Sequence, residues 1–573
     1  MKQVFLFTLA IGIAALLLAP AQVLAAPGDT LVVYATPKAL DEVITADTLV
    51  GGNQAHKVYK LVSRDTTYLF QGAITVKTDF TVLGVTDPVT GRPPCIQPAV
   101  LSDNSIPASL FVLTGKKTKA TFKNLYLLGL ATNSSANNGG VAIQVSADSI
   151  TVTVDHSVFE EWLTFAIGYN GNYDKFFITN NNFRNMVEPN QWYIGEVLRN
   201  EWPGAAYTDS VVMKYNTMFC VNGYAAGTVT KYYETYFEFT HNSVVLMYKN
   251  PMFIFNVTNA KINNNIFYGA YAGAINKTEY PWWDQLWSPE IGSIIDLDTL
   301  DLAKDSVFNP GDKANANFRW LSEAKRNVEV KNNAWFFPAS LTSWWKAWND
   351  TAHTDSLYLP TWMNTRTTGM FSDKVHWPGL VQSGNVNLDP SYGASIPAVL
   401  TQSTNGLLAW SALCRQGTLT TQFWDYQKTH VGSAANWKPA WPVPEANDMK
   451  YTNAALKTGG TDGGPIGDPN WFGILLSART PSEGVPQSYA LSQNYPNPFN
   501  PATKIDFTIP AASQVELKVY NVLGQEVATL VNETLTPGSH TVTFDASKFS
   551  SGVYMYKITA GSFVSTRKMV LLK

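Results

Sequence analysis

The chain has 573 residues, a formal net charge of −3, and neither a basic nor an acidic tail. This near-neutral balance excludes the charge pattern of a nucleic-acid-binding protein. The length exceeds one ordinary compact core, so we expect several domains or an elongated repeat domain with an appendage. Aromatic residues make up 13% of the chain and include 18 Trp, which suits stacking against sugars or protein partners. The three cysteines, Cys95, Cys220 and Cys414, allow one disulfide at most, and their spacing indicates no zinc site.

The N-terminal segment has the pattern of a secretory signal peptide. Lys2 precedes an apolar run over residues 4–19, and the sequence VLA before Ala26 is typical of a cleavage site. A membrane anchor is the alternative, but the apolar run is short for one. We therefore predict a signal peptide over residues 1–25, export, and no transmembrane segment in the mature chain.

The segment TPKALDEVI predicts a short helix near the start of the mature chain. Thr36 suits the N-cap and Pro37 the first helical position, and Leu40, Val43 and Ile44 share one face. The segments that follow are short, rich in β-branched and aromatic residues, and broken by Gly, Asp and Asn. We expect mostly β structure from there on.

A short pattern then recurs: an apolar residue, two variable residues, Asn or Ser, one variable residue and a second apolar residue. Its copies are VDHSVF, ITNNNF, MKYNTM, FTHNSV, INNNIF and VKNNAW. The fourth positions, separated by 24, 35, 26, 23 and 68 residues, are Ser157, Asn181, Asn216, Asn242, Asn265 and Asn333. Three of the five separations are close to one common length, which is typical of structural repeats.

A repeat of this size predicts a parallel β-solenoid, in which successive coils stack and equivalent residues form columns. In such a column each Asn can donate its amide to the carbonyl oxygen of the next Asn, so that buried polar groups are satisfied coil after coil. The predicted ladder comprises Asn181, Asn216, Asn242, Asn265 and Asn333, with continuous apolar columns beside it. An antiparallel sandwich with Asn-rich turns is the alternative, but it requires no common register.

This pattern resembles the right-handed parallel β-helix superfamily to which pectate lyases and many cell-surface proteins belong. The resemblance covers about residues 29–340 and implies the fold alone, because that superfamily holds lyases, hydrolases, adhesins and structural proteins. We predict an all-β chain whose residues 26–476 form such a β-helix with an N-terminal cap helix. From about residue 284 the regularity fades into Trp-rich loops, and the cluster GGTDGGPIGDPNWFG is expected to close the domain.

The last part of the chain predicts a second, small β domain. Residues 477–487 form a polar linker, and Val515, Leu517 and Val519 then alternate with polar residues, as in a strand with one buried face. About six or seven such strands would make a small immunoglobulin-like β-sandwich over residues 488–573. The prolines of NYPNPFNPAT keep the preceding arm extended.

Four motifs of this part, NYPNPFNPAT, VYNVLGQEV, GVYMYKI and the terminal KMVLLK, closely resemble the type A C-terminal sorting domain of the type IX secretion system. The resemblance implies a Gram-negative bacterial protein that travels through the periplasm and across the outer membrane, with the secretion machinery as its partner. The protein would then be released or attached at the cell surface. A sugar-binding accessory sandwich is the alternative.

Catalytic residues are only weakly indicated. Pectate lyases pair a basic side chain with a cation, commonly calcium held by several carboxylates. The predicted outward column contains Asp155 and Lys214, about two coils apart, and Arg199 lies in a nearby turn; solvated surface charges are the alternative explanation. No Asp cluster repeats at successive coils, so we predict no metal site and leave calcium as a possible cofactor. His156 and His241 lie beside the ladder, where we expect turn hydrogen bonds.

Six aromatic residues in loops between coils are candidate stacking platforms for a polysaccharide: Trp192, Tyr193, Trp202, Trp282, Trp283 and Trp287. The alternative is that they pack the loops onto the solenoid. We predict an exported protein that binds polysaccharide or another extracellular ligand. A polysaccharide lyase or hydrolase acting on acidic glycans is the first alternative function, and a structural surface or filament protein is the second.

Overall fold

The structure, a computed structural model, describes residues 30–572 apart from internal gaps. The gaps are residues 50–52, 63–66, 89–90, 134–139, 187–194, 201–206, 229–232, 255–256, 277–291, 298, 300–322, 352–355, 402–405, 417, 419–448, 473–489, 492–493, 495–496, 498, 510–512, 536–537 and 562. The chain divides into two compact units, Met1–Ile474 and Leu475–Lys573, which are described separately. The predicted signal peptide and linker lie outside the described residues and stay predictions.

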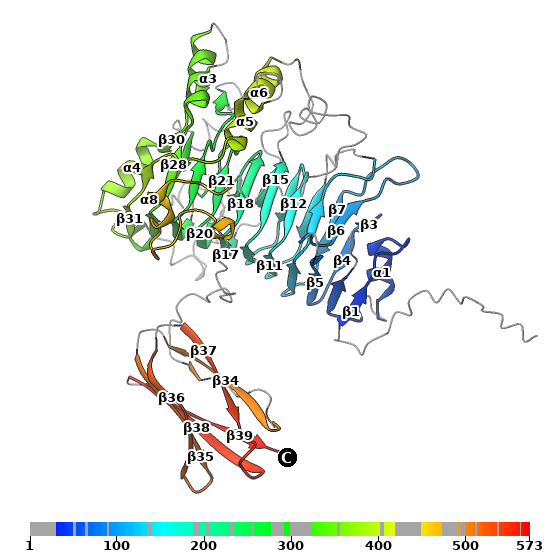
Figure 1. The fold of residues 1–573 in the computed structure, drawn as a ribbon, viewed down its shortest axis with the longest axis vertical. Coiled ribbons are helices and arrows are strands. Elements are labelled where there is room, and N and C mark those ends of the chain that lie inside the picture. The colour runs from blue at the N-terminus through cyan, green and yellow to red at the C-terminus, as the bar shows by residue number, and fades with distance from the viewer. Residues whose placement is uncertain are drawn as a thin grey trace, which may run out of the picture. The chain divides into compact units, whose positions relative to one another are not determined.

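Three long parallel sheets build the first unit (Figure 1). The 11-stranded sheet contains, in spatial order, β1 (Thr30–Val33), β2 (Val58–Leu61), β5 (Phe80–Gly84), β8 (Lys119–Lys123), β11 (Thr151–Asp155), β14 (Lys175–Thr179), β17 (Tyr207–Lys214), β20 (Tyr233–Thr240), β23 (Val257–Asn263), β27 (Asn327–Lys331) and β31 (Leu380–Ser383).

The ten-stranded sheet contains β3 (Thr67–Phe70), β6 (Cys95–Pro98), β9 (Tyr126–Leu128), β12 (Val158–Glu160), β15 (Asn182–Met186), β18 (Thr217–Val221), β21 (Ser243–Val245), β24 (Ile266–Tyr268), β28 (Ala334–Phe336) and β32 (Val386–Asn387). The seven-stranded sheet contains β4 (Ile74–Val76), β7 (Ser109–Leu113), β10 (Val141–Val145), β13 (Phe165–Tyr169), β16 (Glu196–Asn200), β19 (Ala226–Thr228) and β22 (Met252–Phe253).

The chain visits the three sheets in turn, as in the sequence β8, β9, β10, β11, β12, β13. Each turn therefore adds one strand to each sheet, and the strands pair in parallel with the previous coil. This is a parallel β-helix, so the fold predicted from the repeat is confirmed.

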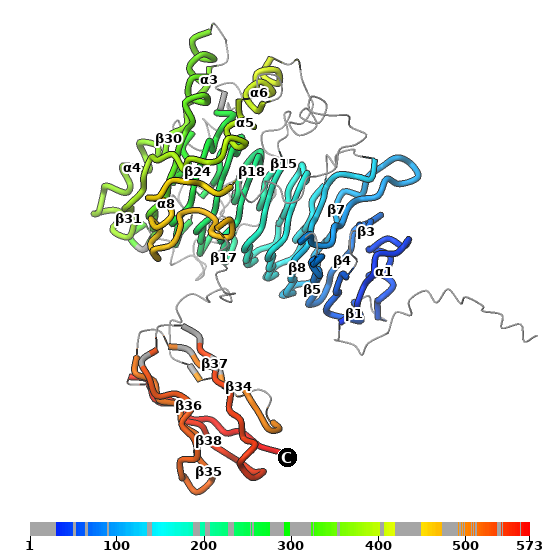
Figure 2. Tube along the Cα trace, in the orientation of Figure 1, coloured from blue at the N-terminus to red at the C-terminus, as the bar shows by residue number. Residues whose placement is uncertain are grey.

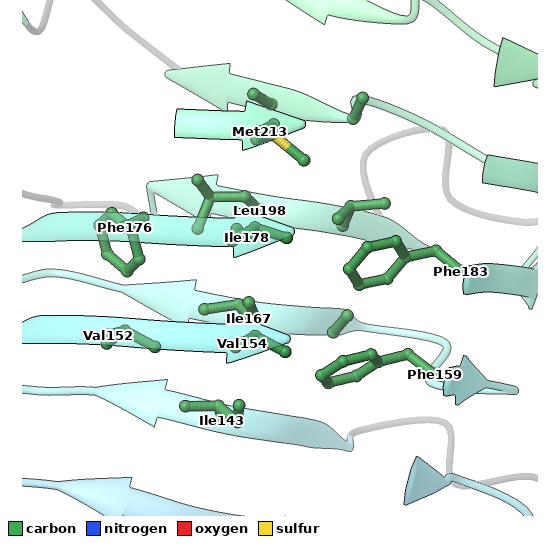
Figure 3. Packing of buried hydrophobic residues seen from close by; sticks show 14 of the residues in the cluster. Ile143, Val152, Val154, Phe159, Ile167, Phe176, Ile178, Phe183, Leu198 and Met213 are labelled. Atoms are coloured by element: carbon green, nitrogen blue, oxygen red, sulfur yellow. The ribbon is translucent and has the colours of Figure 1, made fainter. Parts of the chain in front are cut away.

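The core of the β-helix lies between the inner faces of its sheets. Figure 3 shows Val154, Ile178 and Met213 stacked from the 11-stranded sheet, with Phe159 and Phe183 stacked beside them. All five side chains are fully buried, and the two phenyl rings lie 4.9 Å apart between centroids. Burial of a side chain of this size stabilises the fold by roughly 1.5–3 kcal/mol, so the columns hold neighbouring coils in register.

An Asn ladder runs through the turns between the 11-stranded and ten-stranded sheets. Asn181 donates its backbone N–H and its side-chain amide to Oδ1 of Asn216, at 3.0 and 3.1 Å. The same double donation repeats from Asn216, Asn242, Asn265 and Asn333, each time to the next Asn of the column. The last acceptor is Asn385, which the sequence pattern had not included.

The backbone of this turn explains why the ladder forms. The residue before each ladder position has a positive φ: His156 (50°), Asn180 (57°), Tyr215 (58°), His241 (54°), Asn264 (59°), Asn332 (49°) and Gly384 (65°). A single left-handed residue turns the chain sharply between two strands. The next side chain then points along the stack of coils, where it meets its counterpart.

A short helix, α1 (Leu40–Ala46), packs against β3 and β4 at the N-terminal end of the β-helix. Its apolar residues Leu40, Val43 and Ile44 are buried, as the sequence indicated. The predicted helix start is wrong, however, because the N-cap is Ala39 and carries no side-chain cap. Thr36 instead accepts a hydrogen bond from the backbone N–H of Lys38 at 3.3 Å, which closes a local turn before the helix.

The region after residue 270 adds helices and short strands that the repeat pattern did not predict. These elements are β25 (Ile275–Asn276), β26 (Ser293–Ile295), η3 (Glu323–Lys325), α3 (Ala339–Asp350), β29 (Leu357–Tyr358), β30 (Thr361–Met363), α4 (Thr365–Ser372), α5 (Ser395–Thr401), α6 (Leu407–Arg415), α8 (Ala454–Lys457) and η5 (Pro469–Phe472). Helices α3, α5 and α6 contribute Trp345, Ile396 and Trp410 to a second core cluster. That cluster includes Phe219 and Tyr268, so these helices cover the side of the ten-stranded sheet that points away from the β-helix core.

The Gly/Asp/Pro-rich segment 459–472, here called the strap, lies along the ladder turns (Figure 2). Asn332 donates to the carbonyl oxygen of Gly459 at 2.7 Å, and Asn264 accepts from the backbone N–H of Thr461 at 2.9 Å. Farther along the strap, the Trp471 indole donates to Thr217 at 2.7 Å. The strap thus runs back over several coils and fastens them together, on the opposite side of the turn from the core.

The second unit consists of two antiparallel sheets. One contains β33 (Ala490–Leu491), β34 (Ala502–Ile509) and β37 (Gly538–Asp545), and the other contains β36 (Glu526–Leu535), β35 (Ser513–Asn521), β38 (Gly552–Ala560) and β39 (Phe563–Leu571). Val515, Leu517 and Val519 are fully buried in its core, which confirms the alternation predicted for that strand. Across both units, no helix in the described part of the chain is long and apolar enough to span a bilayer.

Candidate functional site

The outward side of the 11-stranded sheet, here called the outer face, presents three columns of mostly polar side chains. Strands β8 to β27 pair in strict register, so every second residue points away from the core. The first column is Lys119, Thr151, Lys175, Ser210, Tyr236, Asn259 and Asn327. The second is Thr121, Thr153, Phe177, Val212, Glu238, Lys261 and Glu329, and the third is Lys123, Asp155, Thr179, Lys214, Thr240, Asn263 and Lys331.

Asp155, a predicted catalytic candidate, is surrounded by hydrogen-bond donors. It forms an ion pair with Lys123 at 2.8 Å, and Nδ1 of His156 lies 2.9 Å from its Oδ1. Thr179 and Asn180 donate to its Oδ1 at 2.9 and 2.8 Å. Burial alone would raise the pKa of Asp155, but His156, Lys123 and Asn180 outweigh it and hold the pKa well below the usual range of a carboxyl. Asp155 is therefore a permanent anion that organises the surface and is poorly suited to accept a proton.

Lys214, the second candidate, lies two coils farther along the same column. Its Nζ lies 2.7 Å from Oε1 of Glu238, and the two side chains are only 15% and 14% exposed. Tyr236 donates its hydroxyl to the other carboxylate oxygen of Glu238 at 2.8 Å. Burial and the Glu238 carboxylate raise the pKa of Tyr236 well above its usual value. Lys214, Glu238 and Tyr236 therefore form a charged and hydrogen-bonded group in the middle of the outer face.

Lysine–carboxylate pairs recur in other coils of the outer face. Lys331 contacts Glu329 at 2.6 Å, and Asn263 donates to the same carboxylate at 2.5 Å. Burial would raise the pKa of Glu329, but the contacts with Lys331 and Asn263 lower it overall. In an earlier coil, Lys175 contacts Asp209 at 3.4 Å. Ion pairs between lysine and carboxylate side chains of these strands thus recur along this surface.

Arg199, the third candidate, lies on β16 of the seven-stranded sheet and not with Asp155 and Lys214. Its Nη1 contacts both carboxylate oxygens of Glu196, at 2.7 and 2.8 Å, and both side chains are buried. The guanidinium carbon lies 5.6 Å from the ring centroid of Tyr224. Burial raises the pKa of Glu196, although Arg199 opposes the shift. The structure therefore does not bring the three candidates into one site.

The six loop aromatics proposed as stacking platforms all fall outside the described residues. Trp192, Tyr193, Trp202, Trp282, Trp283 and Trp287 therefore stay predictions. The histidine His241 is described: its Nε2 lies 3.3 Å from Asp462 of the strap and 3.2 Å from the Asn264 amide. Burial lowers the pKa of His241, so the neutral ring is favoured in this turn.

No metal centre is apparent in the described part of the chain, where no three His, Cys, Asp or Glu side chains converge as ligands. Asp296 directly follows β26, within the segment where the sequence predicted Trp-rich loops, and its side chain is buried. Its Oδ1 accepts hydrogen bonds from Asn364 at 2.7 Å and Arg366 at 2.8 Å. This carboxylate connects β26 with α4 and has the environment of a structural group.

A buried polar group on the ten-stranded sheet was not anticipated from the sequence. Glu160 accepts from the Tyr126 hydroxyl and from Arg184 Nη2, the latter at 2.7 Å, and Asn185 donates to its other oxygen at 2.7 Å. Glu160 and Arg184 occupy equivalent positions in consecutive coils. Extending the six-residue repeat pattern by one residue would have aligned Glu160 with Arg184 and predicted this pair of opposite charges.

Comparison with known proteins identifies the second unit. Residues 493–572 match the family model described as the secretion system C-terminal sorting domain. No curated protein matches the chain by sequence. A matching solved structure is the 1.7 Å crystal structure of jun a 1, the major allergen from cedar pollen. It shares 12% identity over 42% of this chain and 67% of that one, with a TM-score of 0.26.

The weak structural match adds nothing to the fold assignment, which rests on the strand pairing of the chain itself. The C-terminal match agrees with the motifs NYPNPFNPAT and KMVLLK and with the antiparallel sheets of the second unit. The chain therefore carries the C-terminal sorting domain of the type IX secretion system and is a secreted cargo protein of that system.

Proposed function

We propose that this protein binds a polysaccharide along the outer face of its 11-stranded sheet, at or outside the surface of a Gram-negative bacterium reached through the periplasm. The observation that supports this most directly is the column arrangement of the outer face. Hydroxyl, amide and ion-paired side chains repeat there from β8 to β27, and most of them are partly exposed. The sorting domain delivers the chain to the space where such ligands occur.

The geometry suits a polymer better than a small molecule. Coils stack about 4.8 Å apart, so donors and acceptors recur at a short, constant interval along the axis of the β-helix. Phe177 and Tyr236 add two partly exposed aromatic rings among the polar residues. Aromatic faces beside hydrogen-bonding groups are a common means of holding sugar rings.

The enzyme alternative has less support. A lyase needs a basic side chain next to a group of carboxylates that hold a cation. Lys214 contacts Glu238 at 2.7 Å, and Arg199 contacts Glu196 at 2.7 Å, so each candidate base is already engaged by one carboxylate. The structural alternative needs a large apolar or self-complementary face, whereas the outer face is mostly polar.

Affinity electrophoresis of the chain from Ala26 to Lys573 through gels that contain different polysaccharides tests the proposal. We expect retardation by at least one polysaccharide. Tyr236→Ala and Lys214→Ala should each weaken binding roughly tenfold or more, as for central contact residues. Lys346→Ala, on the exposed side of α3, is the matched control and should bind like the parent protein. Equal binding by all variants would show that the outer face is not the binding surface.

The same preparations should be incubated with uronate polysaccharides, with and without calcium. Ultraviolet absorbance would report the unsaturated product of β-elimination. A calcium-dependent signal that disappears in Lys214→Ala would replace the binding proposal with a lyase.

A further inference from the structure

We infer that the ligand of the outer face is an uncharged, hydroxyl-rich polysaccharide and not a polyanion. This inference rests on the proposed function and narrows it to a ligand class. It concerns the second and third columns of the outer face, from Thr121 to Glu329 and from Lys123 to Lys331, here called the central strip.

Charges in the central strip are compensated locally. The strip contains four lysines and three carboxylates, namely Lys123, Lys214, Lys261, Lys331, Asp155, Glu238 and Glu329. Three of the lysines contact a carboxylate of the strip, at 2.8, 2.7 and 2.6 Å. Lys261 occupies the column position between Glu238 and Glu329, so the sign of the charge alternates along that column.

A polyanion would have to compete with these internal carboxylates. Lys214 and Glu238 are both mostly buried, so moving Lys214 toward a ligand carboxylate would leave Glu238 poorly solvated and without its cation. Breaking a pair of this kind costs more than the pair contributes, because the remaining charge is uncompensated. The low pKa values of Asp155 and Glu329 also keep these carboxylates ionised, and they would repel a uronate chain.

An uncharged sugar avoids this competition. Its hydroxyl groups can donate to the outer lone pairs of the carboxylates without displacing the lysines, because an ionised carboxylate has several acceptor positions. Thr121, Thr153 and Thr179 supply partly exposed hydroxyl groups between the charged residues, and Phe177 supplies a ring in the same strip. The strip therefore offers mixed donors and acceptors with nearly balanced charge.

The inference is tested by comparing retention of the chain from Ala26 to Lys573 on neutral and anionic polymers. Hydroxyethyl cellulose, laminarin and galactomannan represent neutral chains, and polygalacturonate and alginate represent polyanions. We expect retention by at least one neutral polymer that changes less than twofold between 50 and 500 mM NaCl, because screening does not act on uncharged ligands. We expect no retention by either polyanion at 50 mM NaCl.

Two variants sharpen the test. Glu238→Gln keeps the shape of the side chain but releases the charge of Lys214, so we expect a new retention by polygalacturonate, at least fivefold above the parent protein and lost at 500 mM NaCl. Glu329→Gln, at a more exposed pair, should act in the same way through Lys331 and keeps the test valid if the first variant folds poorly. Asp350→Asn releases Lys346 outside the outer face and is the matched control, with no gain expected.

The outcomes separate the two proposals. If the parent protein binds polyanions but not neutral polymers, and Lys214→Ala abolishes that binding, the outer face is a glycan site and the inference about ligand class is wrong. If the parent protein binds neither class, the proposed function itself fails. Absence of any gain in both Glu→Gln variants would also contradict the inference, because the lysines would then not be held back by their carboxylates.

Discussion

Asn333 donates both its backbone N–H and its side-chain amide to a single acceptor, Oδ1 of Asn385, at 3.1 and 2.9 Å. The same relationship links every pair of neighbours from Asn181 onward, so each ladder residue satisfies polar groups of the coil before it. At the other end, Ser157 donates its backbone N–H to Asn181 at 2.8 Å. The ladder therefore couples the stability of each coil to that of the next, and loss of an interior member should affect two coils at once.

Replacement of an interior ladder residue should be far more costly than replacement of the terminal one. Asn242→Ala removes the acceptor of Asn216 N–H and its amide, and the donor to the carbonyl oxygen of Met213. These groups are buried, and each one left without a partner costs about 1–3 kcal/mol. We expect a loss of roughly 3 kcal/mol or more, measured as the shift in a urea unfolding curve followed by tryptophan fluorescence.

Asn385→Ala is the matched control, because Asn385 accepts the same two hydrogen bonds but is partly exposed. Water can replace the lost acceptor there, and we expect at most a third of the effect. Equal losses at the two positions would show that the hydrogen bonds of the ladder are not what stabilises the coils.

The packing of the strap against the ladder turns should require glycine at position 467. This residue has φ of +86°, and a Cβ placed there would lie 2.8 Å from Oγ of Ser243 and 2.9 Å from Cδ1 of Ile266. We expect Gly467→Ala to lift the strap from the turns and to expose it to proteases. Limited proteolysis followed by mass spectrometry should locate new cleavage sites within residues 459–472.

Gly463→Ala provides the control for backbone strain alone. Gly463 also has a positive φ, of +77°, but a Cβ there meets no atom within 4 Å. Both variants carry the cost of a left-handed alanine, of the order of 1 kcal/mol. Only Gly467→Ala adds the steric clash, so similar digestion of the two variants would contradict a closely packed strap.

The ladder and the outer face illustrate how far the sequence allows prediction. The ladder columns could be predicted because one residue type recurs between apolar positions. Asn385 was missed because its flanking column positions are Gln382 and Asn387, which are polar and terminate the apolar columns at the last coil. Glu238 was missed as the partner of Lys214 because it belongs to the next coil and a different column, so the contact is diagonal.

The helical region could not be predicted for a different reason. Between Asn265 and Asn333 the repeat is interrupted by an insertion, and after Asn333 the Trp-rich segments follow no β period. The pattern of α3, with Leu341, Trp345 and Trp348 buried, reflects packing on other helices and on the ten-stranded sheet. Local periodicity alone does not identify such a tertiary partner. Arg199 was likewise placed in a turn because its partner Glu196 lies on the same strand, where spacing does not indicate an ion pair.

Glu234 should make the first unit less stable as pH rises. Its side chain is buried, its Oε2 has no hydrogen-bond partner among the described residues, and burial raises its pKa to about 8. A raised folded-state pKa means that the folded protein binds a proton the unfolded chain releases above about pH 4.5. Stability contributed by this group is therefore present at low pH and is lost as pH rises toward 8.

Glu234→Gln removes that titration. We expect the variant and the parent protein to have similar unfolding midpoints at pH 5, and the variant to be more stable at pH 8.5, in urea titrations at both values. If the difference in unfolding midpoint between Glu234→Gln and the parent protein is the same at both pH values, the raised pKa inferred for Glu234 is wrong.

The ion pair between Arg199 and Glu196 should be needed for the stability of the first unit. Arg199→Met leaves the fully buried carboxylate of Glu196 without its cation, which typically costs about 3–5 kcal/mol. The loss should be larger at pH 9 than at pH 6, because Glu196 is protonated more readily at the lower pH. Adding Glu196→Gln should recover a large part of the loss, as urea unfolding would show. If Arg199→Met is as stable as the parent protein, the pair is dispensable for the fold and Arg199 again becomes a candidate for ligand contact.

The second unit should be dispensable for folding of the first and necessary for its export. Among the described residues, the core clusters of the first unit end at Phe472, and the core of the second unit begins at Leu491. All 18 Trp precede residue 475, so tryptophan fluorescence reports on the first unit alone. A chain that ends at residue 489 should therefore keep the unfolding midpoint of the full chain.

In a host with a type IX secretion system we expect this shortened chain to accumulate in the periplasm, while the full chain reaches the surface or the medium, as immunoblots of cell fractions would show. Surface delivery of the shortened chain would mean that residues 490–573 are not its export signal, and a lower midpoint would mean that the two units stabilise each other.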